Sequence, residues 1–140
     1  EAGIAFAFDK MKRTPNTRLA HRLIWAGERE SVVAQNAIVE RLFRAYFEEG
    51  EDIGRRDVLL SLARDAGLDE KRAASLLDNE ASLEAVLDLE DKGISMGIRG
   101  VPYFLLIGKY AISGAQPPEV WLDALPKIEA EARSEGVRTV

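Results

Sequence analysis

Residues 100–118 read GVPYFLLIGKYAISGAQPP, and this stretch contains the clearest strand pattern in the chain. Its first part, Tyr103–Ile107, is aromatic and aliphatic without alternation, which is typical of a strand covered on both faces. A Gly-Lys pair then forms a predicted two-residue turn into a second strand over residues 110–113, so a β-hairpin is expected. A last helix is predicted from Gln116 onward, because the two prolines that follow it are tolerated in a first helical turn.

The chain on the N-terminal side of this hairpin is predicted to be helical, because its apolar residues recur at spacings of three and four. The expected helices are Thr17–Glu28, residues 31–48, and three that begin at or just after Asp57, Asp69 and Ser82, the last ending near Gly97. The aromatic side chains of the second helix, Phe43, Tyr46 and Phe47, are expected in the core. In the final helix, Pro126 predicts a kink or an early break, since proline costs about 3 kcal/mol inside a regular helix.

The composition excludes several classes of function. The chain has 140 residues, a net charge of −5 and no basic cluster larger than that at residues 10–13, so it lacks the positive surface of a nucleic-acid-binding protein. No apolar run approaches the roughly 20 residues that a membrane helix needs. The lack of cysteine excludes disulfides and thiolate metal sites, and the single histidine excludes a site with two histidine ligands. No metal site is therefore expected.

The predicted hairpin is incomplete as a sheet. A two-stranded hairpin is marginally stable in water, and an apolar edge strand favours aggregation. The remaining strand candidate is the weak pattern at Ile4–Phe8. We therefore expect strands outside these 140 residues, on the N-terminal side, to complete the sheet. The alternative is a second copy that supplies a strand by swapping.

The stretch Gly100–Phe104 resembles the cis-proline loop of the thioredoxin superfamily. Further segments resemble the FrnE-type branch of the DsbA-like proteins: Pro15–Thr17, Ala20–Leu23, Leu42–Phe47, Asp52–Gly54, Ala66–Asp69, Gly97–Pro102 and Ile112–Pro117. The resemblance implies an α/β, thioredoxin-like (DsbA-like) fold with a helical insertion. The implied division is an irregular lead-in at 1–15, a helical insertion domain at 16–97 and the C-terminal β-β-α half of the thioredoxin-like domain at 98–140.

The same resemblance implies a cytoplasmic thiol–disulfide oxidoreductase of the DsbA/FrnE type. Its partner would be a disulfide- or thiol-containing protein or peptide, and it would need no cofactor. The Cys-x-x-Cys of such enzymes is missing from this sequence, so no catalytic residue is assigned and the chain alone is expected to be inactive. One alternative is a glutathione-dependent isomerase or transferase of the 2-hydroxychromene-2-carboxylate isomerase or kappa class, which uses serine. The other is a non-catalytic truncated or domain-swapped fragment, including a homodimer.

The candidate substrate-binding residues lie first around the proline loop. The resemblance implies a cis bond between Val101 and Pro102, after Gly100, which would turn the Val101 N–H and C=O outward to pair with an extended substrate. The stretch from Ser113 to Gln116 precedes a predicted helix, whose free N–H groups suit a carboxylate. An ordinary helix cap explains this stretch equally well, because Pro117 and Pro118 each remove a donor.

Two more candidates lie in the first predicted helix or just before it. His21 is the sole histidine and could carry protons near neutral pH, but no serine or carboxylate lies three or four residues away to assist it. A packing or surface role is the simpler interpretation of His21. Asn16 is either a substrate-facing amide or the cap of this helix, and capping is the safer interpretation.

Overall fold

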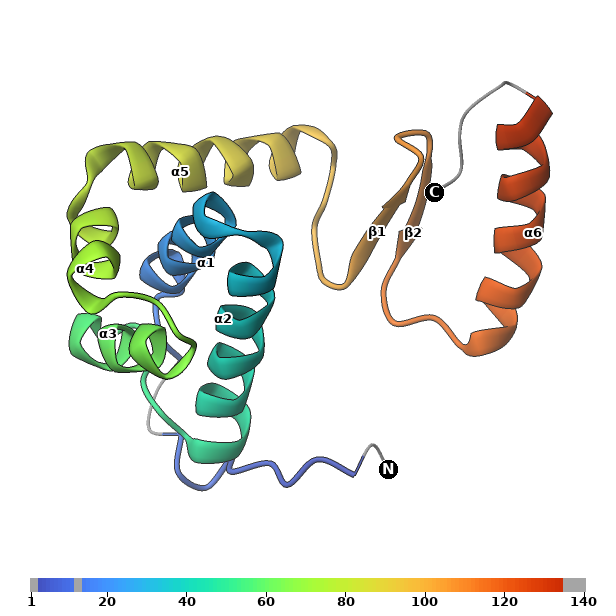
Figure 1. Cartoon of the computed structure of the whole chain (residues 1–140). Helices are drawn as coiled ribbons and strands as arrows, with labels where there is room; N and C mark the ends of the chain where they lie inside the picture. The colour runs from blue at the N-terminus through green and yellow to red at the C-terminus, as the bar shows by residue number, and fades with distance from the viewer. Residues whose placement is uncertain (1–2, 12–13, 135–140) are drawn as a thin grey trace. The chain divides into compact units, whose positions relative to one another are not determined.

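The computed structural model describes residues 3–11 and 14–134, and the chain divides into two compact units that meet between Asp91 and Lys92. The first unit contains α1 (Arg18–Glu30), α2 (Val32–Arg44), the π-helix η1 (Ala45–Glu49), α3 (Arg56–Asp65), α4 (Glu70–Asp78) and most of α5 (Glu80–Ser95) (Figure 1). The second contains β1 (Tyr103–Leu106), β2 (Tyr110–Ser113) and α6 (Pro118–Ser134). The predicted domain boundary after residue 97 stays a prediction.

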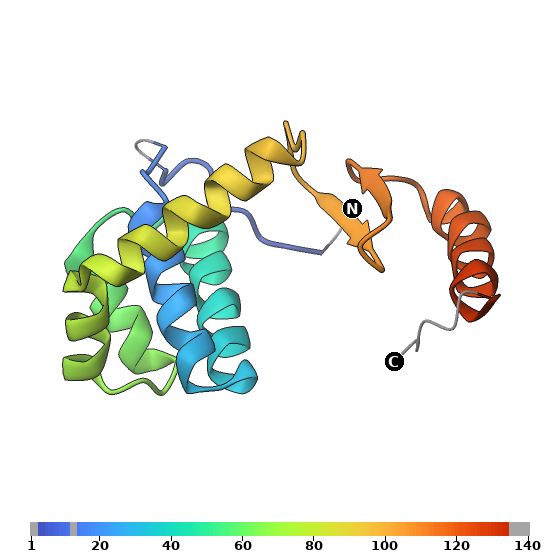
Figure 2. The same ribbon diagram turned by 90° about the horizontal axis from the view of Figure 1, so that it is seen from above.

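The core of the first unit lies where α1 meets α2, α3 and α4, and α1 and α2 lie side by side (Figure 2). Leu23 of α1, Ile38 of α2 and Leu59 of α3 are almost completely buried there. Ala26 and Gly27 are also buried on α1 and bring α2 close, because neither has a bulky side chain. The predicted apolar stripes of the first four helices therefore meet in one core.

Local capping signals set several helix ends. Ser31 and Asp69 accept hydrogen bonds from the N–H groups of Ala34 and Arg72, at 3.0 and 2.8 Å, as N-caps do. Asn16 accepts from the N–H of Arg18 at 3.0 Å, although the N-cap position itself is one residue later. The helix predicted from Ser82 begins two residues earlier, because the Asn79 side chain caps it through the N–H of Ala81 at 2.9 Å.

The predicted helix at 31–48 is not one regular α-helix. Its last turn is the π-helix η1, which ends at Gly50 in a left-handed conformation with a φ of +74°. The carbonyl of Phe47 accepts a hydrogen bond from the N–H of Ala7 at 2.8 Å, and this bond holds the irregular lead-in against η1. The weak strand candidate at Ile4–Phe8 is therefore wrong: the segment docks on a helix end and pairs with no strand in the described chain.

The prediction that the aromatic residues of this helix are all core was wrong for Phe43. Phe43 is 57% exposed, whereas Tyr46 and Phe47 are half-buried. Ile38 and Leu42 already fill the arc of α2 that faces the core. Phe43 follows Leu42 by about 100° around the helix, so it lies beyond that arc.

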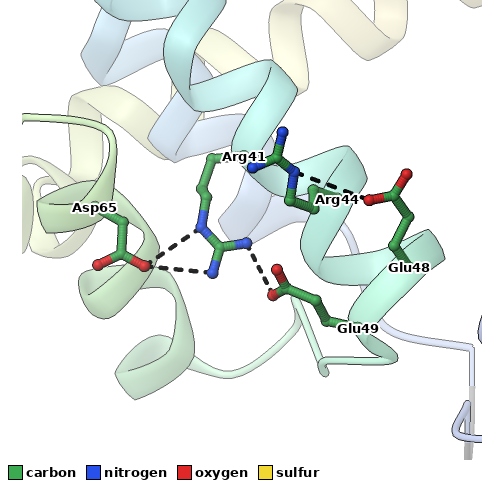
Figure 3. Close-up of polar contacts among 5 residues, drawn as sticks. All are labelled: Arg41, Arg44, Glu48, Glu49 and Asp65. Atoms are coloured by element: carbon green, nitrogen blue, oxygen red, sulfur yellow. Dashed lines mark hydrogen bonds and ion pairs between the residues drawn. The ribbon is translucent and has the colours of Figure 1, made fainter.

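Arg41 connects three elements of the first unit (Figure 3). Its guanidinium donates to Glu49 of η1 at 2.9 Å and to Asp65 of α3 at 3.3 Å. Partial burial lowers the pKa of Arg41, but the interactions with Glu49 and Asp65 outweigh it, so the pKa is raised. The Arg41 side chain is 22% exposed, which shields these ion pairs more than those at the surface.

We expect Arg41→Met to lower the free energy of unfolding by about 1–2 kcal/mol, because two carboxylates lose a charged hydrogen-bond partner. Urea unfolding followed by circular dichroism measures this loss. Arg44→Met is the matched control, because Arg44 lies on the same helix. Its ion pair with Glu48 is exposed, with the charged atoms 3.9 Å apart, so the free energy of unfolding should change by less than about 0.5 kcal/mol. Equal losses in both variants would contradict a bridging role for Arg41.

The second unit contains the predicted hairpin, with β1 and β2 antiparallel and Tyr103 opposite Ser113. The turn has three residues, 107–109, instead of the predicted two, because Leu106 already pairs with Tyr110. The ring of Phe104 lies edge to face with that of Trp121 of α6, with the two ring centroids 4.6 Å apart. Phe104 and Leu105 stay 39% and 46% exposed, so the described residues do not supply the cover that was predicted for both faces of this strand, and this cover stays a prediction.

Helix α6 begins at Pro118, two residues after the predicted start at Gln116. It continues through Pro126 to Ser134, so the predicted early break does not occur. Proline removes a single N–H from the helix, and Leu122, whose carbonyl loses that partner, is exposed to solvent.

Candidate functional site

The Val101–Pro102 segment lies at the entry to β1. Their peptide bond is cis, and Val101 is 90% exposed. The Pro102 carbonyl accepts from the N–H of Gly114 at 2.8 Å, which ties the segment to the end of β2. Within the described residues, the backbone N–H and C=O of Val101 have no backbone partner. Gly100 before them is also exposed.

The open edge of β1 continues this unpaired backbone. In an antiparallel pair, the backbone groups of successive residues point alternately to the partner strand and away from it. The bond at Pro102 places residues 102, 104 and 106 on the side of β2. The backbone groups of Tyr103 and Leu105 therefore face away from β2, along an edge that no described strand covers.

Ser113 and Gln116 lie at the same end of the hairpin as Pro102. Both are exposed, and the Gln116 side-chain amide donates to the Ser113 carbonyl at 2.7 Å. This bond closes the bend between β2 and α6, as a cap would. The stretch therefore adjoins the proline loop, but the side-chain amide of Gln116 is turned toward its own backbone.

His21 and Asn16 belong to the first unit, on and just before α1. Both are exposed. His21 lines two hollows of that unit, one between α1 and α5 and one beside α2. Its neighbours in the first hollow include Trp25, Glu28 and Glu90. Glu90 is already held by Arg18, whose guanidinium donates to it at 3.1 Å.

A polar cluster at the hairpin turn had no signal in the sequence, because its members are far apart along the chain. Lys109 donates to Glu131 of α6 at 3.2 Å. The interaction with the Glu131 carboxylate raises the pKa of Tyr110, and Tyr110 and Lys109 lower the pKa of Glu131. The cluster joins the turn to α6 and so supports the geometry of the hairpin from the end opposite Val101.

Within residues 3–11 and 14–134, the structure shows neither a metal site nor a membrane-spanning helix. Histidine and carboxylate side chains form no group there that could hold a metal ion. None of the helices described is long and apolar enough to cross a bilayer.

Comparison with known proteins gives the family. Residues 1–126 match the model of the DSBA-like thioredoxin domain. A crystal structure of a probable DsbA oxidoreductase from Streptomyces coelicolor superposes with a TM-score of 0.70 and 31% sequence identity, over 89% of this chain and 51% of that one. The chain thus spans about half the length of that relative. No curated protein matches the sequence. The α/β fold predicted from the sequence is confirmed, and the chain belongs to the DsbA-like thioredoxin family.

Proposed function

We propose that this chain is the substrate-binding part of a thiol–disulfide oxidoreductase of the DsbA/FrnE type. Membership of the DsbA-like family supports the reaction class. The observation that carries the proposal is the exposed, unpaired backbone of Val101 beside the open edge of β1. An extended peptide can pair with such a backbone as an added strand.

The proposed division of labour follows from the residues present. In this reaction a cysteine thiolate attacks a substrate disulfide, forms a mixed disulfide and releases the other sulfur as a thiolate. This sequence contains no cysteine, so that thiolate belongs to a segment outside these 140 residues. Val101 would align the substrate through one donor and one acceptor. Pro102 has no N–H, and its carbonyl is already bonded to Gly114.

The partner in this proposal is a disulfide- or thiol-containing protein or peptide, the compartment is the cytoplasm, and no cofactor is required. The glutathione-dependent alternative ranks second. It would use the N-terminus of α6 to hold a carboxylate, but Pro117 and Pro118 supply no N–H there, and the Gln116 amide is bonded to Ser113.

Peptide binding tests the role of Val101. We expect a cysteine-containing extended peptide, its sulfur blocked by methylation, to shift the amide resonance of Val101 in a ¹H–¹⁵N NMR titration. N-methylation of the peptide amide that donates to the Val101 carbonyl should weaken binding about fivefold, because one hydrogen bond contributes about 1 kcal/mol. The control peptide is methylated one residue later, where the N–H points to the other side. Equal binding of both peptides would contradict strand addition at Val101.

Reduction of insulin tests the reaction class. The polypeptide should be produced with the residues encoded ahead of Glu1. We expect a Cys-x-x-Cys in those residues and insulin turnover in the presence of a dithiol. A serine at that position without turnover would instead favour the glutathione-dependent branch.

A further inference from the structure

The first unit contains an apolar cavity of about 280 Å³ that the proposed function does not use. The lead-in, α1, α2, η1 and the loop after it surround it. The lining residues are Thr14, Pro15, Thr17, Ala20, His21, Ile24, Val39, Leu42, Phe43, Tyr46, Phe47 and Ile53.

The floor of this cavity belongs to the core, whereas its rim is open. Ala20, Leu42 and Ile53 are buried members of the core cluster, so the unit is already closed beneath the cavity. Phe43 stands on the rim and is more than half exposed. An occupant would therefore enter from the side of Phe43 without displacing the core.

Aromatic rings form one wall. The ring of Phe47 lies edge to face with that of Tyr46, with centroids 4.8 Å apart, and tilted against that of Phe43, with centroids 6.0 Å apart. Such rings favour edge-to-face or offset contacts with a further aromatic ring, each contributing roughly 0.5–1.5 kcal/mol beyond the buried area. A wall of this kind therefore favours an aromatic ligand.

The lining excludes charged ligands. It contains no Asp, Glu, Lys or Arg, and its polar side chains are two threonines, His21 and the Tyr46 phenol. A charge buried there would lose its hydration with no opposite charge to replace it. His21 and Thr17 can satisfy a single hydroxyl or N–H of a ligand near the mouth.

The volume of the cavity limits the size of the ligand. An engineered apolar cavity of about 150 Å³ in another protein stays dry and binds benzene. The present cavity is nearly twice as large, at about 280 Å³, which suits two fused rings. We propose that it is a binding site for a small, uncharged aromatic compound of two fused rings that carries one hydroxyl or N–H.

Titration of the full chain with 1-naphthol and with indole tests this site, with ¹H–¹⁵N NMR and calorimetry as readouts. We expect saturable binding, with shifts confined to the lead-in, α1, α2, η1 and the loop after it. 1-Naphthoate should bind at least tenfold more weakly, because its carboxylate has no countercharge in the lining. Binding that does not saturate, shifts spread over both units, or equal affinity for 1-naphthoate would overturn the proposal.

Matched variants locate the site. Val39→Trp fills the cavity and should weaken 1-naphthol binding at least tenfold. Val33→Trp introduces the same side chain on the same helix at a position that is 78% exposed and outside the lining, and it should leave binding unchanged. If Val39→Trp fails to fold, Phe43→Ala removes part of the rim instead and should weaken binding severalfold. Unchanged affinity in the folded filling variant, or in Phe43→Ala, would place the ligand elsewhere.

Discussion

Leu23→Ala is expected to lower the free energy of unfolding by about 3 kcal/mol, since large-to-small changes at buried leucines cost roughly 2–5 kcal/mol. Leu23 is completely buried on α1, in the cluster that also contains Leu59 and Leu77. The loss combines the transfer of the removed methyl groups with the cavity left in this core cluster. Urea unfolding measured by circular dichroism at 222 nm gives the value, and the unfolding transition of the first unit should shift.

Leu89→Ala is the control for this experiment. Leu89 lies on α5 in the same unit and is 59% exposed, so the same chemical change removes little buried surface. A loss below about 1 kcal/mol is expected there. Similar losses at Leu23 and Leu89 would show that the contacts around α1 do not form the main core.

The features that the sequence predicted correctly depend on short segments. Ser31 and Asp69 cap helices because a side-chain oxygen reaches an N–H three residues later. The hairpin could be predicted because its apolar run and its glycine turn lie within a dozen residues of one another.

The features that it missed depend on contacts between distant segments. Nothing near Phe47 indicates that its carbonyl receives the N–H of Ala7, so neither η1 nor the docked lead-in could be predicted. The exposure of Phe43 depends on where α1 and α3 meet α2. The same limit applies to the Lys109–Glu131 pair, whose members are 22 residues apart.

The candidate site was predictable in part. The sequence motif identifies Val101 and Pro102. The structure then shows, through the register of β1 with β2, that Ser113 lies at the same end of the hairpin. The cavity beside His21 was not predictable, because its lining comes from three separate stretches of the chain. A periodic pattern identifies which face of a helix is apolar, but it does not show whether that face is covered.

Gly27→Val is expected to lower the free energy of unfolding by about 3 kcal/mol, because overpacking a tight contact costs roughly 1–3 kcal/mol and valine adds branching at the Cβ. A Cβ at Gly27 would lie 2.5 Å from Cδ1 of Ile38 and 3.0 Å from the Cα of Gln35. The Ile38 methyl can rotate away, but the Gln35 backbone moves only if α2 shifts as a whole. Denaturant unfolding measures the cost.

Two further variants separate crowding from the intrinsic preference of glycine. Gly93 is also inside a helix, but the nearest atom to its added Cβ is Ile98 Cδ1 at 4.0 Å, so Gly93→Val should change stability by less than about 0.5 kcal/mol. Ile38→Val removes the clashing Cδ1, so it should cost less in the Gly27→Val background than alone, with a coupling of at least about 0.5 kcal/mol. Additive losses would mean that the methyl of Ile38 does not set the distance between α1 and α2, and that the backbone contact at Gln35 alone does so.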